Sequence, residues 1–242
     1  MRILVFSDIH ANLPALEAVL ENAGDFDAAW CLGDLVGYGP NPNEVIERVR
    51  SLPNLICLLG NHDAAAIGML DIENFNFEAR QSILWVQNYL STESSQFLKS
   101  LPEKLVTDEV TLAHGSPRSP IWEYILDAYS AWENLDHFST PFCFVGHTHL
   151  PIGFHISPDA QPMNWFLPSI TTPHAMIPRM ILNPGSVGQP RDHNPRAAYA
   201  IYDTEQHIWS AHRVEYDVRL TQEHIRLAGL PPRHADRLAG GW

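Results

Sequence analysis

Short apolar runs alternate with amphipathic stretches over the first quarter of the chain. The runs Ile3–Phe6, Ala28–Leu32 and Leu55–Leu59 have the length and composition of strands that are buried on both faces. Between them, residues 14–22 and 44–52 carry apolar side chains at helical spacing. This β-α-β-α-β order predicts a largely parallel sheet with right-handed crossovers.

The pattern changes after the third predicted strand. Residues 64–102 are mostly helical in pattern, with a helix near 77–90, and we expect an insertion that either caps a site or completes the core. Later strands fall mostly in pairs around polar turns, at 105–106, 111–113, 142–145, 152–156, 165–167, 198–202 and 207–214. Two further helices are predicted near 122–135 and 220–228, followed by a Pro/Gly-rich tail. No repeat or linker divides the chain, so we expect a single domain over residues 1–242.

Composition and charge narrow the class of protein. With 45% apolar and 18% charged residues among 242, the chain has ample material for a core. The formal charge of −13 argues against stable nucleic-acid binding, because phosphate backbones demand Lys and Arg. No apolar run approaches the ~20 residues that a membrane helix needs, and the N-terminal run is too short for a signal peptide. The cysteines Cys31, Cys57 and Cys143 lie in apolar runs, so we expect small buried side chains and, by default, a cytoplasmic protein.

Side chains that can bind a metal ion follow five of the predicted strands. In chain order they are Asp8 and His10, then Asp34, Asn61 and His114, and finally His147 and His149. Any one of these motifs is weak evidence, because alternate residues of a strand often simply face one side. Together they indicate one site, since ligands of an open α/β sheet bind outside the carboxyl ends of its strands.

The types and number of these ligands indicate which ions fit. Carboxylate, imidazole and amide groups without thiolate suit first-row divalent transition-metal ions such as Mn, Fe, Co, Ni or Zn. The set is too large for one ion, whereas two ions can share a bridging carboxylate. Two ions roughly 3.5–4 Å apart form a clamp for in-line attack at phosphorus. The sequence therefore predicts a dinuclear site for phosphate ester chemistry.

Read in order from Asp8 to His149, these motifs resemble those of the calcineurin-like metallophosphoesterase superfamily: Asp-x-His, Gly-Asp, Gly-Asn-His-Asp/Glu, a mid-chain His and Gly-His-x-His. Residues 35–42, 183–192 and 229–231 further resemble a bacterial and archaeal branch of predicted phosphodiesterases. The resemblance implies an α/β (α+β) fold, a two-sheet β sandwich flanked by helices. It also implies hydrolysis of phosphodiesters, small phosphate esters or nucleotides by attack of a metal-bridging hydroxide.

The same resemblance implies a role for each matching residue. One ion would be held by Asp8, His10, Asp34 and His149, and a second by Asp34, Asn61, His114 and His147, with Asp34 as the bridge. His62 would donate a proton to the leaving group or stabilise charge on the phosphoryl group. Asp63 would orient the ring of His62.

Departures from the family pattern narrow the range of substrate classes. No arginine follows Gly33-Asp34, and Asp63 stands where protein serine/threonine phosphatases carry Glu, which disfavours a phosphoprotein phosphatase. A phosphomonoesterase or a dinucleoside tetraphosphatase stays an alternative, as does a non-catalytic protein-binding scaffold of the same fold. The physiological substrate, the native metal and the oligomeric state stay open.

Four residues are candidate substrate contacts, and three of them have an ordinary structural alternative. Asn12 could reach a bound phosphate or cap the first helix. Tyr38 could stack on a base or only cover its loop. Arg191 could supply the missing positive group or form a surface pair with Asp192, and His193 is the fourth candidate. The histidines expected to be ordinary surface or strand residues are those at 137, 155, 174, 207, 212, 224 and 234.

Overall fold

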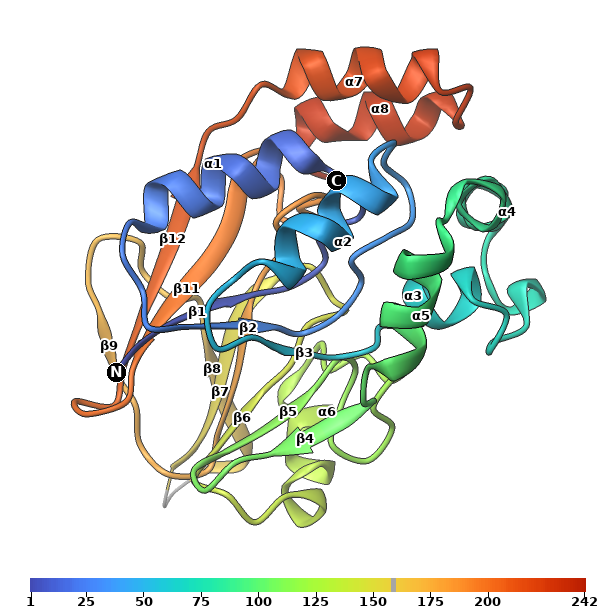
Figure 1. Cartoon of the computed structure of the whole chain (residues 1–242). Coiled ribbons are helices and arrows are strands. Elements are labelled where there is room, and N and C mark those ends of the chain that lie inside the picture. Colours follow the sequence, from blue (N-terminus) through green and yellow to red (C-terminus); the bar gives the residue numbers. More distant parts are fainter. Residues whose placement is uncertain (158–159) are drawn as a thin grey trace.

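Two six-stranded sheets form the centre of the molecule, as Figure 1 shows for the computed structural model, which describes residues 1–157 and 160–242. The first sheet has the order β3-β2-β1-β11-β12-β9. Its strands are β1 (Arg2–Phe6), β2 (Ala28–Cys31), β3 (Ile56–Cys57), β9 (His174–Ala175), β11 (Ala197–Asp203) and β12 (Ile208–Val214). The parallel pairing of β1 with β2 and of β2 with β3 confirms the order predicted from the alternating pattern.

The second sheet has the order β4-β5-β6-β10-β7-β8. Its strands are β4 (Lys104–Val106), β5 (Val110–Ala113), β6 (Phe142–Phe144), β7 (Pro151–Ser157), β8 (Ala160–Phe166) and β10 (Met180–Pro184). Antiparallel pairing of β4 with β5, of β7 with β8 and of β11 with β12 confirms the three predicted hairpins. Within this sheet, β6 runs parallel to both β5 and β10.

The faces of the two sheets that meet are apolar and rich in aromatic rings. The ring of Phe144 on β6 lies 5.3 Å from Tyr202 on β11 and 4.8 Å from Trp209 on β12. Trp30 on β2 approaches the same Phe144 ring at 6.2 Å. Burial of such rings on both inner faces holds one sheet on the other. The predicted two-sheet sandwich flanked by helices is confirmed.

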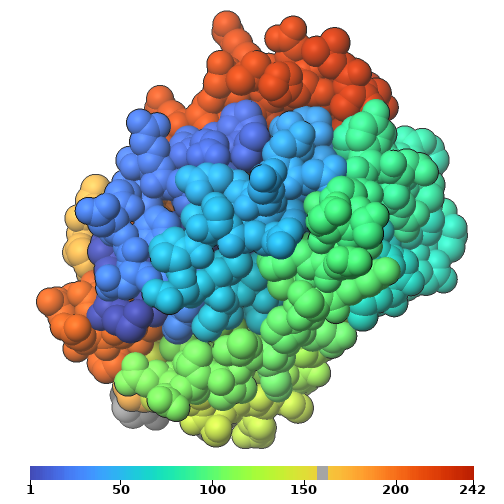
Figure 2. All heavy atoms as spheres, viewed as in Figure 1, coloured from blue at the N-terminus to red at the C-terminus, as the bar shows by residue number. Residues whose placement is uncertain are grey.

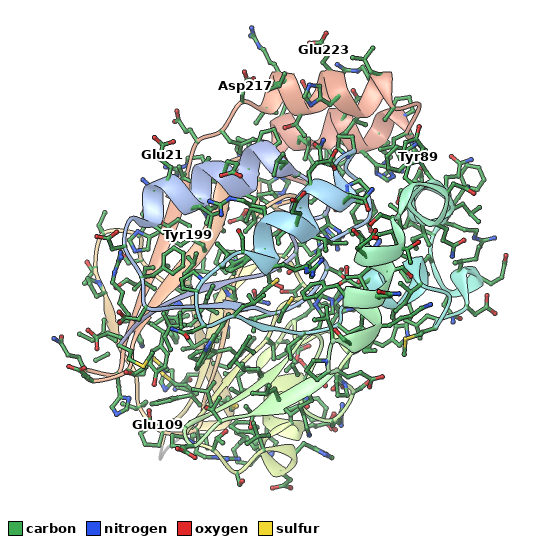
Figure 3. The ribbon with its side chains drawn as sticks, viewed as in Figure 1. Glu21, Tyr89, Glu109, Tyr199, Asp217 and Glu223 are labelled. Carbon is green, nitrogen blue, oxygen red and sulfur yellow. The ribbon has the colours of Figure 1, made fainter. Side chains whose placement is uncertain are left out.

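Helices pack on the outside of this sandwich. They are α1 (Leu13–Ala23), α2 (Pro42–Arg50), α3 (Asn61–Ala66), α4 (Phe77–Tyr89), α5 (Thr92–Ser100), α6 (Ala128–Glu133), α7 (Val218–Leu227) and α8 (Pro232–Gly240), with short 3-10 turns at Ile72–Asn74 and Leu135–His137. Leu16 and Val19 of α1 and Val45 of α2 are buried in the apolar cluster that covers the first sheet. Tyr199 of β11 points toward α1, where its hydroxyl donates a hydrogen bond of 2.8 Å to the side-chain oxygen of Asn22 (Figure 3).

The segment 64–102 carries most of α3 together with α4 and α5, and Figure 2 shows it in teal and green beside α2. Val86 of α4 and Leu98 of α5 are fully buried in the same apolar cluster as α1 and α2. Phe75, just before α4, is buried beside the loops that follow the strands. The segment therefore contributes to the core, and its role as a cap over a site stays a proposal.

The predicted helix near 122–135 is wrong over its first half, because α6 begins only at residue 128. The carboxylate of Glu123 accepts hydrogen bonds from the hydroxyl of Ser116 at 2.5 Å and from the amide of Asn134 at 3.0 Å. These bonds hold the residues before α6 in a loop. Asp127 then caps α6 by accepting hydrogen bonds from backbone N–H groups. Over residues 122–127, side-chain hydrogen bonds therefore favour a loop although the apolar residues have helical spacing.

The C-terminal residues predicted as a tail instead form α8. The helix begins at Pro232, where proline is preorganised for the first turn, and ends at Gly240, after which Gly241 caps it with a φ of +62°. Ile225 of α7 packs against Leu230 and Leu238 in a small separate cluster. Among the described residues, no helix combines the length and apolarity that crossing a membrane requires.

Candidate metal centre

The loops that follow β1, β2, β3, β5 and β6 meet at one edge of the sandwich. They bring together all the predicted metal-binding side chains, which are Asp8, His10, Asp34, Asn61, His114, His147 and His149, and all are buried. Five of these residues, namely Asp8, His10, Asp34, His147 and His149, have left-handed backbone conformations, with φ between 50° and 65°. Such conformations are costly away from glycine and cluster at functional sites.

Asp34 lies between two groups of ligands. Its Oδ2 atom is 3.6 Å from Nε2 of His10 and 3.4 Å from Nε2 of His114. Its other oxygen, Oδ1, accepts a hydrogen bond of 2.9 Å from the backbone N–H of His62. Gly60 allows this approach, because a Cβ there would lie 2.1 Å from Oδ1 of Asp34. One oxygen of Asp34 thus faces both groups while the other is held in place.

The first group consists of Asp8, His10 and His149, whose ligand atoms lie within 4.8 Å of one another. Nε2 of His149 is 3.3 Å from Oδ1 of Asp8 and 3.2 Å from Nε2 of His10. Oδ1 of Asp8 is buried, and within the described residues it accepts no hydrogen bond. A buried carboxylate oxygen without a donor fits a bound cation, which would satisfy it.

The second group consists of Asp34, His114 and His147, with Asn61 beside them. Nε2 of His114 lies 3.2 Å from Nδ1 of His147 and 3.2 Å from Oδ1 of Asn61. Nitrogen and oxygen lone pairs therefore converge on one point here too. This donor set, without sulfur, fits a divalent transition-metal ion.

Backbone carbonyls fix the direction of each imidazole. Nδ1 of His10 lies 3.0 Å from the carbonyl oxygen of Val36, and Nδ1 of His114 lies 2.8 Å from that of Leu32. The other two pairs are Nδ1 of His149 with Gln189 O at 2.5 Å and Nε2 of His147 with Trp122 O at 3.2 Å. In a neutral ring, when one nitrogen donates to a carbonyl, the other is left unprotonated and can bind a metal ion.

Burial sets the protonation of most groups in the centre. It lowers the pKa of His10, His147 and His149 well below the usual value, so these rings are neutral, the form that binds metal ions. Burial raises the pKa of Asp8 to about 7; the charge of Asp34 adds to this and that of His114 opposes it.

Asp34 and His114 form the charged pair of the centre. Burial opposes ionisation of Asp34, but His114 and the neighbouring imidazoles outweigh it and hold the pKa of Asp34 well below its usual range. Burial likewise disfavours the protonated form of His114, yet Asp34 and Asp8 outweigh it and raise the pKa of His114 to about 9. Without a bound cation, the proton on His114 supplies the positive charge that Asp34 needs.

The predicted hydrogen bond between His62 and Asp63 is not formed. Both oxygens of Asp63 accept backbone N–H groups instead, from Val36 at 3.0 Å and from Gly60 at 3.1 Å. Asp63 is the third residue of α3, and at that position a carboxylate satisfies the free N–H at the helix start. The ring of His62 is held by packing, 4.4 Å from the ring of Tyr38 and 5.1 Å from that of Phe75.

Asn12 caps the first helix, which is the structural role that the sequence allowed, and its contact with substrate stays a prediction. Its Oδ1 accepts from the backbone N–H of Ala15, as an N-cap of α1. The same oxygen accepts from the hydroxyl of Thr221, and its amide donates to Gly188 O and to the hydroxyl of Tyr216. Both polar atoms of the Asn12 side chain, Oδ1 and Nδ2, are thus hydrogen-bonded within the protein.

Tyr38 and Arg191 lie beside the centre, and their contact with substrate stays a prediction. The ring of Tyr38 is 4.6 Å from that of His10. Arg191 does not pair with Asp192, which accepts a hydrogen bond from Arg213 instead. Arg191 lines one pocket with Tyr38 and Tyr124, whose rings pack on His10 and His147. The charge of Arg191 lowers the pKa of Asp8, His10 and His149. His193 is exposed.

One residue near the centre escaped the sequence reasoning. His234, expected to be an ordinary surface residue, is buried on α8 with its ring 4.8 Å from that of Tyr38. The available signal was a pair of arginines and a histidine, Arg233-His234-x-x-Arg237, on one turn of an otherwise acidic chain. The loop after β10 borders the site, where the hydroxyl of Ser186 donates to the carbonyl of Asp8 at 2.8 Å.

Comparisons with known proteins agree with this geometry. The sequence model of the calcineurin-like phosphoesterase superfamily domain matches residues 1–207. The crystal structure of a metallophosphoesterase from Sphaerobacter thermophilus is similar, with a TM-score of 0.91 and 47% identity, covering 100% of this chain and 99% of that one. An uncharacterized protein from Methanocaldococcus jannaschii is 37% identical over an alignment of 244 positions, which covers 98% of this chain and 96% of that protein. Phosphodiesterase YfcE from Escherichia coli K12 is 27% identical over an alignment of 223 positions, which covers 85% of this chain and 89% of that protein.

Proposed function

This chain belongs to the calcineurin-like phosphoesterase superfamily, and from that premise we propose that it is a dinuclear metal-dependent phosphoesterase. Its substrates would be phosphodiesters or small phosphate esters. The observation that carries the proposal is Oδ2 of Asp34, which faces His10 in one ligand group and His114 in the other. A carboxylate shared in this way supports two ions rather than one.

The residues that would hold the ions follow from the two groups. Asp8, His10 and His149 would hold one ion, His114, His147 and Asn61 the other, and Asp34 both. Bound there, divalent ions such as Mn²⁺, Fe²⁺, Co²⁺, Ni²⁺ or Zn²⁺ would activate water and polarise the phosphoryl group. Asn61 contributes an oxygen without a charge, which leaves the loaded centre attractive to an anionic phosphate.

His62 stands beside this centre without belonging to either ligand group in the proposal. Burial lowers its pKa to about 4, so its imidazole is neutral near pH 7 and carries one N–H. We assign this ring to the leaving-group oxygen or to a phosphoryl oxygen. The neutral ring would donate a hydrogen bond there, and transfer of a proton to the leaving group would require the imidazolium form. Packing against Tyr38 and Phe75 keeps it in position.

The similarity to YfcE, described as a phosphodiesterase, supports phosphodiesters as the first substrates to test. The decisive experiment measures hydrolysis of bis-p-nitrophenyl phosphate and of p-nitrophenyl phosphate by folded protein supplied with Mn²⁺, Ni²⁺ or Co²⁺. We expect turnover that is lost in EDTA and regained on adding metal. Absence of turnover with every ion, together with low metal content by elemental analysis, would instead favour the scaffold role.

A further inference from the structure

A polar pocket of about 420 Å³ opens beside the candidate metal centre. One wall comes from α8, which presents Arg233, His234 and Arg237, and another comes from Arg191 in the loop after β10. Positions 233, 234 and 237 share one face of the helix, because residues three and four apart are neighbours on a helix surface. The superfamily model matches residues 1–207, so α8 lies outside the part of the chain that this model describes.

Two aromatic rings join this pocket to the metal centre. The ring of Tyr38 lines the pocket and lies 4.8 Å from His234 on one side and 4.6 Å from His10 on the other. Tyr124 also lines the pocket and stacks on His147 at 3.8 Å with 14° between the planes. A molecule in the pocket would therefore be separated from each ligand group by one tyrosine ring, Tyr38 on the side of His10 and Tyr124 on the side of His147.

The charge of the pocket is opposite to that of the protein. Three guanidinium groups line it, and the one carboxylate among its lining residues is Glu78, which Arg233 contacts at 3.2 Å. An excess of two positive charges thus collects in one pocket of a chain with a net charge of −13. Guanidinium groups bind phosphate oxygens in a planar, two-point geometry, which makes phosphate the natural ligand for such a lining.

Two buried donors or acceptors in the pocket lack partners. Within the described residues, Nε of Arg191 and Nδ1 of His234 are buried and make no hydrogen bond. His234 is only 2% exposed, and its Nε2 is already bonded to the backbone carbonyl of Glu78 at 3.1 Å. Buried polar atoms in native proteins are nearly always satisfied, so these two point to a polar ligand.

We infer that this pocket binds a second, non-scissile phosphate group, and that the substrate is a small molecule carrying at least two phosphates, such as a nucleoside or dinucleoside polyphosphate. The inference rests on the proposed function for the first phosphate, which would be bound at the metal centre. A small molecule fits better than a nucleic acid, because three arginines gather in one pocket of a chain whose net charge is −13.

The test compares substrates with one and with several phosphates in the holoenzyme. We would measure kcat/KM with Mn²⁺ for bis-p-nitrophenyl phosphate and for diadenosine tetraphosphate, in the wild type and in the Arg233→Gln/Arg237→Gln variant. The ratio of the second value to the first should fall by about tenfold to 10³-fold, the size expected for losing charge-assisted hydrogen bonds. Arg226→Gln is the matched control, because Arg226 lies on the neighbouring helix α7 and pairs with Asp236 in solvent.

An unchanged ratio in the double variant would overturn the inference, and so would an equal loss for both substrates, which indicates only a disturbed fold. Partial recovery of the ratio in Arg233→Lys/Arg237→Lys would support it further. Should the wild type hydrolyse neither substrate, the proposed function fails, and calorimetric titration of inorganic tripolyphosphate in EDTA decides the inference separately. Binding that weakens at least tenfold in the Gln variant supports the pocket; no binding, or equal binding, overturns it.

Discussion

The ring of His62 lies 4.4 Å from the ring of Tyr38, with 54° between their planes. Phe75 meets the edge of the same imidazole at 5.1 Å. Within the described residues, Nδ1 of His62 is buried without a hydrogen-bond partner, and the neighbouring carboxylate of Asp63 is engaged elsewhere. Aromatic packing, rather than a charged partner, therefore determines where this imidazole points.

Replacing His62 by Ala should remove the proposed proton or hydrogen-bond donor. We expect kcat for bis-p-nitrophenyl phosphate to fall by roughly 10²–10⁴, the usual contribution of a general acid or base. Metal content measured by elemental analysis should stay near that of the wild type, because the ion ligands are untouched. His137→Ala, at an exposed position, is the control, and unchanged turnover in His62→Ala would remove this residue from the mechanism.

Gly37 tests whether the position of His62 matters. A Cβ at Gly37 would lie 2.5 Å from Nδ1 of His62, so Gly37→Ala should displace the ring and lower kcat by about tenfold or more. Gly68→Ala is matched to it, because Gly68 also has a positive φ but has no atom within 4 Å of its added Cβ. Both variants should lose about 1–2 kcal/mol of stability, and equal kcat losses would contradict a positional effect.

The metal centre could be predicted from the sequence because its ligands stand in the chain directly after the ends of strands. Once β1, β2 and β3 are recognised as parallel strands, Asp8, Asp34 and Asn61 must lie at the same edge of one sheet. The contribution of the second sheet followed only from the number of motifs, since nothing in the string specifies that β5 and β6 face the first sheet. That packing places His114 within 3.4 Å of Asp34.

Other contacts could not be predicted because they depend on side-chain direction and strand register. Asp63 follows His62 in the chain, but at the start of α3 its carboxylate turns back toward the N–H of Gly60. Asp192 bonds to Arg213, a partner brought near by the pairing of β11 with β12. Because that partner takes up Asp192, the neighbouring Arg191 is left to face the site.

Asp34→Asn tests the bridging carboxylate. We expect wild-type protein to retain about two ions per chain after gel filtration and the variant to lose or weaken both, since each group uses Oδ2. Mn²⁺ should also raise the melting temperature of the wild type more than that of the variant, because an ion stabilises only the fold that binds it. Asp8→Asn should weaken one group only, and full occupancy in Asp34→Asn would contradict the bridge.

Glu123 should make the stability of the loop beneath His147 depend on pH. Burial works to raise the pKa of Glu123, but hydrogen bonds from Arg118, Ser116 and Asn134 outweigh it and lower that pKa to about 2. The loop matters to the centre because the carbonyl of Trp122, the preceding residue, lies 3.2 Å from Nε2 of His147.

A lowered pKa in the folded state means that ionised Glu123 contributes stability above about pH 4.5, and that this contribution is lost as the pH falls toward 2. Glu123→Gln should therefore lower the melting temperature at pH 7, and the difference from wild type should shrink below pH 4.5. Because the side chain is partly exposed, screening limits the loss to about 1 kcal/mol, or about 2–4 °C for a domain of this size. The exposed Glu103→Gln serves as the control, and a difference that grows at low pH would show that the hydrogen bonds do not favour the ionised carboxylate.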